Sequence, residues 1–111
     1  MIFAITSSGN SKTDMLDSRF GRCHTLVFYD NERGNLEFLP NPFRDEEEGV
    51  GPNVVRLIHS KGAGRIVSGS FGLKIKSLLD SHHIQMIIPE REDLTVSEIL
   101  VLIDHGKKSG S

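Results

Sequence analysis

The sequence has 111 residues, 37% of them hydrophobic, which suits one domain with one modest core. A formal net charge of −2 argues against a general nucleic-acid binder, because phosphate contacts need a basic surface, and no apolar run approaches the length that spans a membrane. The single cysteine excludes an intrachain disulfide and the short apolar start lacks the basic segment of a signal peptide, so we expect a cytoplasmic protein.

The first half of the chain predicts a buried strand and an antiparallel hairpin. Residues 2–6 are an apolar run that ends in a polar turn, which is typical of a buried strand. The polar loop at residues 7–22 follows, and loops of that length in compact domains are usually functional or mobile. Residues 25–30 and 36–39 are two further strands, joined by a short turn into a hairpin.

The second half alternates helices with strands. Helices are expected from Pro52, after Gly72, and from the capping box at residues 95–98. Strands are expected at residues 65–68 and 84–88, and this alternation requires parallel pairing through right-handed crossovers. Together with the hairpin it predicts a three-layer α/β/α fold of the ribonuclease H type. Its mixed five-stranded sheet has the order 3-2-1-4-5, with only the second strand reversed.

The chain shows no internal repeat and no second domain. We expect residues 1–105 to form a single domain and residues 106–111 to be a disordered or vector-derived tail. Within the domain, the polar segments 7–20 and 43–48 lack periodicity, so we expect them to be the most mobile.

Three loops leave the same edge of the expected sheet and predict an anion site. The first carries two arginines and the cysteine, and the other two reach helix starts at residues 49–51 and 68–72. Ligands bind open α/β sheets at such an edge, helix starts favour anions, and arginines add charge and planar donors. The alternative is that these glycines only make tight turns. The candidate binding residues are Arg19, Gly21, Arg22, Cys23, Gly49, Gly51, Gly69, Ser70 and Gly72.

Cys23 has two interpretations. It is either a thiolate ligand for a soft metal, activated by nearby arginines, or a small buried core residue at a strand start. A catalytic pair with His24 is disfavoured because adjacent strand residues point to opposite faces. The absence of a second cysteine argues against a closed structural zinc site.

Other motifs have simpler interpretations. Residues 49–51 lack the third glycine of a dinucleotide fingerprint, and no Walker lysine exists. The first strand has no carboxylate, so the two-metal chemistry of ribonuclease H is not expected. The histidines that stand near helix C-termini, where imidazoles suit the dipole, are interpreted as surface residues and not as metal ligands. They are His59, His82, His83 and His105.

Residues 17–23 read Asp-Ser-Arg-Phe-Gly-Arg-Cys before a strand, and a glycine-rich helix start follows. This order resembles the dinitrogenase iron–molybdenum cofactor biosynthesis family over roughly residues 1–105. The resemblance implies a ribonuclease H-like fold and a small non-enzymatic protein that binds, carries or matures an iron–molybdenum or other molybdenum–sulfur cluster. The matching residues are Asp17, Phe20, Gly21, Arg22, Cys23, Gly49, Gly51, Gly69 and Gly72.

The sequence departs from this family at one position. In nitrogenase-linked members a histidine commonly precedes Phe-Gly and is the suspected cluster ligand, whereas this chain has Arg19, which cannot ligate a metal while charged. Three functions therefore stay open: a carrier or chaperone for an anionic metal–sulfur cluster or oxyanion, a protein–protein adaptor without cofactor, and a cysteine-dependent enzyme. The expected partners are an anionic ligand and another protein, with no nucleic acid and no membrane.

Overall fold

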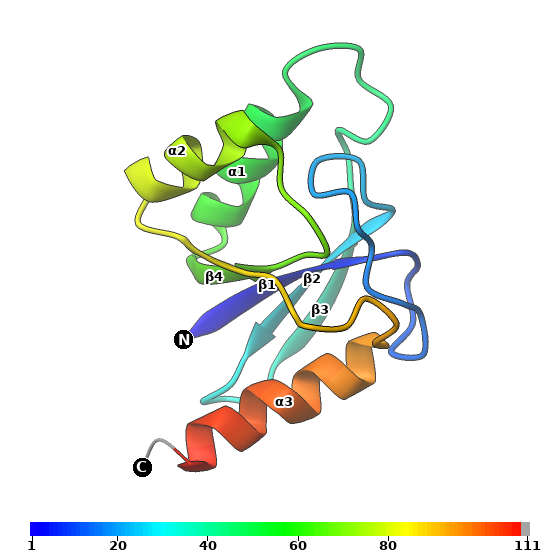
Figure 1. The fold of residues 1–111 in the computed structure, drawn as a ribbon, viewed down its shortest axis with the longest axis vertical. Helices are drawn as coiled ribbons and strands as arrows, with labels where there is room; N and C mark the ends of the chain where they lie inside the picture. The colour runs from blue at the N-terminus through cyan, green and yellow to red at the C-terminus, as the bar shows by residue number, and fades with distance from the viewer. Residues whose placement is uncertain (110–111) are drawn as a thin grey trace.

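The structure is a computed structural model that describes residues 1–109, and it contains a mixed sheet flanked by helices (Figure 1). The strands are β1 (Ile2–Ser7), β2 (Thr25–Asp30), β3 (Leu36–Pro40), β4 (Ala63–Val67) and β5 (Gln85–Ile87). The helices are α1 (Val50–Ser60), α2 (Leu73–Ser81) and α3 (Val96–Ser109).

The sheet has the predicted order β3-β2-β1-β4-β5. β2 is antiparallel to both β1 and β3, while β4 is parallel to both β1 and β5. Only β2 therefore runs against the other strands, which confirms the predicted topology. The physical reason is that a hairpin forces reversal, whereas each helical crossover returns the chain in the same direction.

Helices cover both faces of the sheet, with α1 and α2 side by side on one face and α3 on the other (Figure 1). The alternation of side chains along β1 divides the core, since Ala4 packs towards α1 and α2 and Ile5 packs towards α3. Both side chains are fully buried. The fold is thus held by two apolar layers that fix the positions of the loops at the sheet edge.

The start of α3 follows from the predicted capping box. The backbone N–H of Glu98 donates to Thr95 Oγ1 at 3.1 Å, and the N–H of Thr95 donates to Glu98 Oε1 at the same distance. Such reciprocal bonds satisfy two donors that the first helical turn leaves open. No helix in residues 1–109 is long and apolar enough to cross a membrane.

The last helix extends into the segment that the sequence predicted as a tail. α3 continues through residues 106–109 to Ser109, so this part of the predicted disordered segment is helical. Lysine has a good backbone propensity for helix, which is consistent with the helix continuing past Gly106. Residues 110–111 of that prediction lie outside the described residues.

The long loop after β1 is held by backbone hydrogen bonds. The N–H of Ser8 donates to Met15 O at 2.9 Å, that of Leu16 to Leu94 O at 2.8 Å, and that of Asp17 to Thr6 O at 2.9 Å. These bonds join the loop to itself, to the segment before α3 and to β1. They argue against the expected mobility of residues 7–20, because polarity in a sequence does not reveal which backbone groups find partners.

Candidate functional site

A shallow concavity of about 380 Å³ lies where the loops after β1 and β4 meet the starts of α1 and α2. Six of the nine predicted binding residues line it, whereas Cys23, Gly49 and Gly69 do not. The predicted convergence of loops is therefore present. The full lining is Ser18, Arg19, Phe20, Gly21, Arg22, Val50, Gly51, Ser70, Gly72 and Ile75.

The loop after β4 crosses the loop after β1 at very short range. A Cβ built on Gly69 would lie 2.8 Å from Ser18 Cα, a backbone atom that cannot turn aside. The Gly69 N–H donates to Asp17 O at 3.3 Å, and Ser70 Oγ donates to Ser18 O. Gly69 thus acts by letting the two loops approach, which places Ser18 and Ser70 beside each other on the wall of the concavity.

Two buried hydroxyl groups, one at the end of β1 and one after β4, stabilise this loop crossing from the core side. Thr6 Oγ1 donates to Asp17 O at 2.7 Å and lies 3.0 Å from Ser68 Oγ. Thr6 and Ser68 are fully buried, so these bonds satisfy polar groups that would otherwise be costly in the core. The ends of β1 and β4 are therefore tied to the loop that carries the arginines.

Both helices that reach the concavity begin without a side-chain cap. Gly49 is the N-cap of α1 and Gly72 that of α2, and neither helix has a cap hydrogen bond from a side chain or an acidic residue in its first turn. The first backbone N–H groups of a helix have no intrahelical partner and carry partial positive charge. Gly51 and Gly72 bring these two helix starts to the concavity itself.

The two arginines differ in how far their charge is compensated. Arg19 donates from Nε and Nη2 to the two oxygens of Asp17, each at 3.1 Å, and this contact raises the pKa of Arg19. Arg22 donates from Nη1 to the carbonyl of Arg44 at 2.9 Å and forms no ion pair within the described residues. Arg22 therefore supplies the larger share of the uncompensated positive charge.

Cys23 was predicted to belong to the site, but the structure places it in the core. Its side chain is fully buried in the core between the sheet and α1, and burial, followed by the charge of Asp17, raises the pKa of the thiol to about 12. A protonated and buried thiol is neither an accessible metal ligand nor a nucleophile at neutral pH. Across residues 1–109, no cluster of three or more histidine, cysteine or acidic side chains could hold a metal ion. Of the two interpretations of Cys23, the core residue is the one that the structure supports.

Asn41 is a positioning residue that the sequence interpretation missed. Its Nδ2 donates to Gly21 O at 2.8 Å and to Cys23 O at 3.1 Å, and its Oδ1 accepts from the Phe43 N–H at 3.0 Å. Asn41 is buried, with 7% of its surface exposed. Its hydrogen bonds join the end of β3 to the loop that carries Arg19 and Arg22, the arginine loop. Its place between Pro40 and Pro42 was the only available signal, since prolines cannot donate backbone bonds there.

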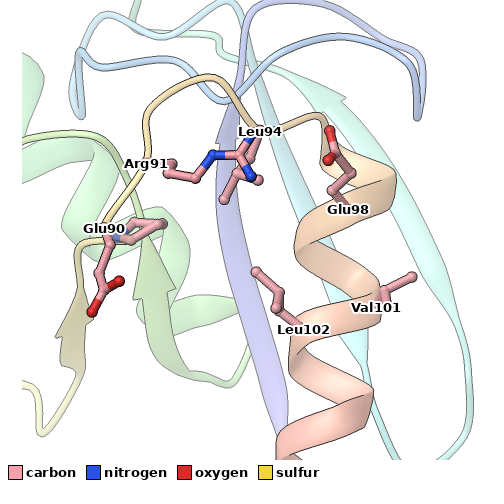
Figure 2. A pocket seen from close by; sticks show the side chains of 7 residues that line it. Glu90, Arg91, Leu94, Glu98, Val101 and Leu102 are labelled. Carbon is pink, nitrogen blue, oxygen red and sulfur yellow. The ribbon is translucent and has the colours of Figure 1, made fainter.

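A larger concavity of about 570 Å³ lies between α3 and the segment that precedes it (Figure 2). Leu94, Val101 and Leu102 give it an apolar wall. Its charged residues are Glu90, Glu98 and Arg91, and the guanidinium of Arg91 pairs with Asp93 at 3.0 Å. Because carboxylates outnumber cations here, this surface does not suit an anion, and the smaller concavity remains the candidate site.

Comparison with known proteins gives a family and a set of related folds. A family model described as dinitrogenase iron–molybdenum cofactor matches residues 1–106. The apo form of the orange protein from Desulfovibrio gigas is 26% identical, with a TM-score of 0.85 over 96% of this chain and 88% of that chain. A provisionally assigned NifB protein from Thermotoga is 29% identical, with a TM-score of 0.79 over 96% and 89%. No curated protein matches this chain.

A third solved structure shows the fold alone. It is a provisionally assigned dinitrogenase from Methanocaldococcus jannaschii, 14% identical, with a TM-score of 0.67 over 96% of this chain and 90% of that chain. Such low identity carries no residue-by-residue argument. It does show that the β3-β2-β1-β4-β5 layout tolerates extensive sequence change.

Proposed function

This chain belongs to the dinitrogenase iron–molybdenum cofactor family, and we propose that it is a non-enzymatic cytoplasmic carrier or chaperone for an anionic metal–sulfur cluster. The cargo is of the iron–molybdenum or another molybdenum–sulfur type, or its oxyanion precursor. The proposed binding place is the concavity between the arginine loop and the starts of α1 and α2.

One observation carries this proposal: two uncapped helix starts and the unpaired charge of Arg22 meet at one concavity. Each helix start contributes typically ~0.3–1 kcal/mol to anion binding, and a charge-assisted hydrogen bond roughly 1.5–3 kcal/mol. No carboxylate lines the concavity to oppose an anion. The family membership supports a cluster or its precursor as the anion.

The available donors decide how a cluster would be held. The lining offers guanidinium groups, backbone N–H groups and the Ser18 hydroxyl, but no thiolate, imidazole or carboxylate. The guanidinium and N–H groups donate hydrogen bonds to oxygen or sulfur and have no lone pair with which to ligate a metal. The cargo would therefore keep its own sulfide or oxo ligands and be bound through them, with Phe20 and Ile75 as the apolar wall.

This mode of binding suits a carrier. A ligand held by charge and hydrogen bonds, in an open concavity and without a covalent metal–protein bond, can be released without breaking metal coordination. The alternative of a cysteine-dependent enzyme is disfavoured because the thiol is buried with a raised pKa.

Purification without oxygen, followed by analysis for molybdenum, iron and sulfide, tests this proposal. We expect molybdenum and sulfide to accompany the protein, or to bind in one equivalent when tetrathiomolybdate is added to protein that lacks them. Substitution Arg22→Ala should weaken this binding, while Arg91→Ala, at the other concavity, should leave it unchanged. Protein that neither carries nor takes up these elements would contradict the carrier function.

A further inference from the structure

Two imidazoles lie together at the far ends of the helices that begin at the concavity. His59 is in the last turn of α1 and His82 is the C-cap residue of α2. Their ring centroids are 4.6 Å apart and the ring planes are tilted by 45°. The sequence did not reveal this pair because its members belong to different helices, which only the packed fold brings side by side.

The ring nitrogens of the pair are uncommitted. Within residues 1–109, neither imidazole forms a hydrogen bond or an ion pair, whereas His24 Nδ1 lies 2.7 Å from Thr25 Oγ1. His59 is exposed and His82 is half-buried, so both rings are within reach of solvent. The neighbouring cation of Lys61 points elsewhere, because its Nζ pairs with Glu37 at 3.0 Å.

The separation of the rings suits a shared metal ion. A metal–nitrogen bond of roughly 2 Å puts the ion roughly 3 Å from each ring centroid. When two rings ligate the same ion, the nitrogen–metal–nitrogen angle is roughly 90° in square geometry and roughly 110° in tetrahedral geometry. Their centroids are then roughly 4.5–5 Å apart. The observed 4.6 Å falls within this range. Two surface rings can turn their nitrogens toward a common point at little cost.

The electrostatic setting also favours a cation. The C-terminal end of a helix carries partial negative charge from carbonyls that lack intrahelical partners. α1 and α2 are packed together, and both end beside this pair of rings. The same two helices thus present their positive ends to the anion concavity and their negative ends to the imidazoles.

We propose that His59 and His82 form a two-imidazole site for a borderline divalent cation such as Cu²⁺, Ni²⁺ or Zn²⁺. Neutral imidazole is a preferred ligand for these ions, and the Irving–Williams order predicts that Cu²⁺ binds most tightly. No third protein ligand completes a cluster in the described part of the chain, so water fills the remaining positions. The bound ion is exchangeable and does not form a structural site.

NMR titration of the protein with CuCl₂ and NiCl₂ tests this site. Substoichiometric Cu²⁺ should broaden the imidazole signals of His59 and His82 together, before that of His24. The variants His59→Phe and His82→Phe keep an aromatic ring in place but remove its nitrogens, and each should weaken Ni²⁺ binding on the order of tenfold or more.

His83→Asn is the matched control. His83 adjoins His82 and has a backbone φ of 57°, which asparagine tolerates. This variant should bind Ni²⁺ as the parent does. If either phenylalanine variant keeps the parent affinity, or if His83→Asn loses as much affinity as they do, the two-imidazole site does not exist.

Discussion

The guanidinium of Arg22 is the strongest electrostatic feature of the concavity. Arg19 shares its charge with the Asp17 carboxylate, whereas Arg22 bonds only to a carbonyl. Arg22→Ala should therefore weaken the binding of tetrathiomolybdate by roughly tenfold or more, and Arg19→Ala should weaken it less. Calorimetric titration of both variants measures their affinities for tetrathiomolybdate. An equal loss of affinity in the two variants would show that Asp17 does not neutralise Arg19.

Cys23 should affect stability and not binding. Since its thiol has a pKa of about 12 against an ordinary value of 9.0, it stays protonated in the folded state where the unfolded chain ionises. The stability that the buried, protonated thiol contributes is complete below the ordinary pKa of 9.0. It is lost as the pH rises from 9.0 toward the raised pKa of about 12. The free energy of unfolding should fall over this range in the parent and fall less in Cys23→Ala, as measured by urea denaturation.

The same variant separates the two interpretations of this cysteine. Cys23→Ala should bind tetrathiomolybdate with the affinity of the parent, because the side chain does not line the concavity. A thiol reagent at neutral pH should react with the unfolded chain only. Rapid reaction of the folded protein, or loss of thiomolybdate binding in the variant, would restore Cys23 as a ligand.

At the scale of elements, the crossing of two loops positions the site. Gly69→Ala should destabilise the protein by about 1–3 kcal/mol, because the new methyl group meets the backbone of Ser18. Gly72→Ala is the control: its methyl group would lie 3.8 Å from Ile75 Cγ1, an ordinary contact. Because alanine is a poorer N-cap residue than glycine, this variant should lose some stability, but less than Gly69→Ala and at most about 1 kcal/mol. Thermal unfolding compares them, and equal stabilities would argue against a tight crossing.

The loop after β1 should exchange its amide hydrogens slowly at Leu16 and Asp17, whose N–H groups bond to the rest of the fold. Residues 43–48 should exchange faster, because most of that segment is exposed. Hydrogen-exchange NMR without ligand measures both. Fast exchange at Leu16 and Asp17 would support the mobile loop that the sequence predicted.

How much the sequence could predict depended on the range of the interaction. The capping box at Thr95 and Glu98 is local, and the strand–helix alternation constrains topology, so both were confirmed. The burial of Cys23 depends on packing against α1 and on Asn41, which no periodicity reveals. Glycines posed the same difficulty, since Gly69 serves a loop crossing whereas Gly21, Gly51 and Gly72 line the concavity.

In the whole molecule, α1 and α2 direct the positive ends of their dipoles to one edge of the sheet and the negative ends away from it. β1 and β4 end where α1 and α2 begin, so the arginine loop and both helix starts converge on one edge. The third helix covers the other face of the sheet and leaves an acidic-rimmed apolar concavity beside it. We therefore expect the first of these surfaces, and not the second, to bind an anion.

Backbone NMR during titration of oxygen-free protein with tetrathiomolybdate tests whether the anion binds at this concavity. We predict that the largest shift changes occur at the amides of Gly21, Gly51 and Gly72, with saturation at one equivalent. Sulfate should displace the ligand at higher concentration, because the donors recognise negative charge. Changes centred on Leu94 and Leu102, or no saturable change at the three glycines, would contradict the account.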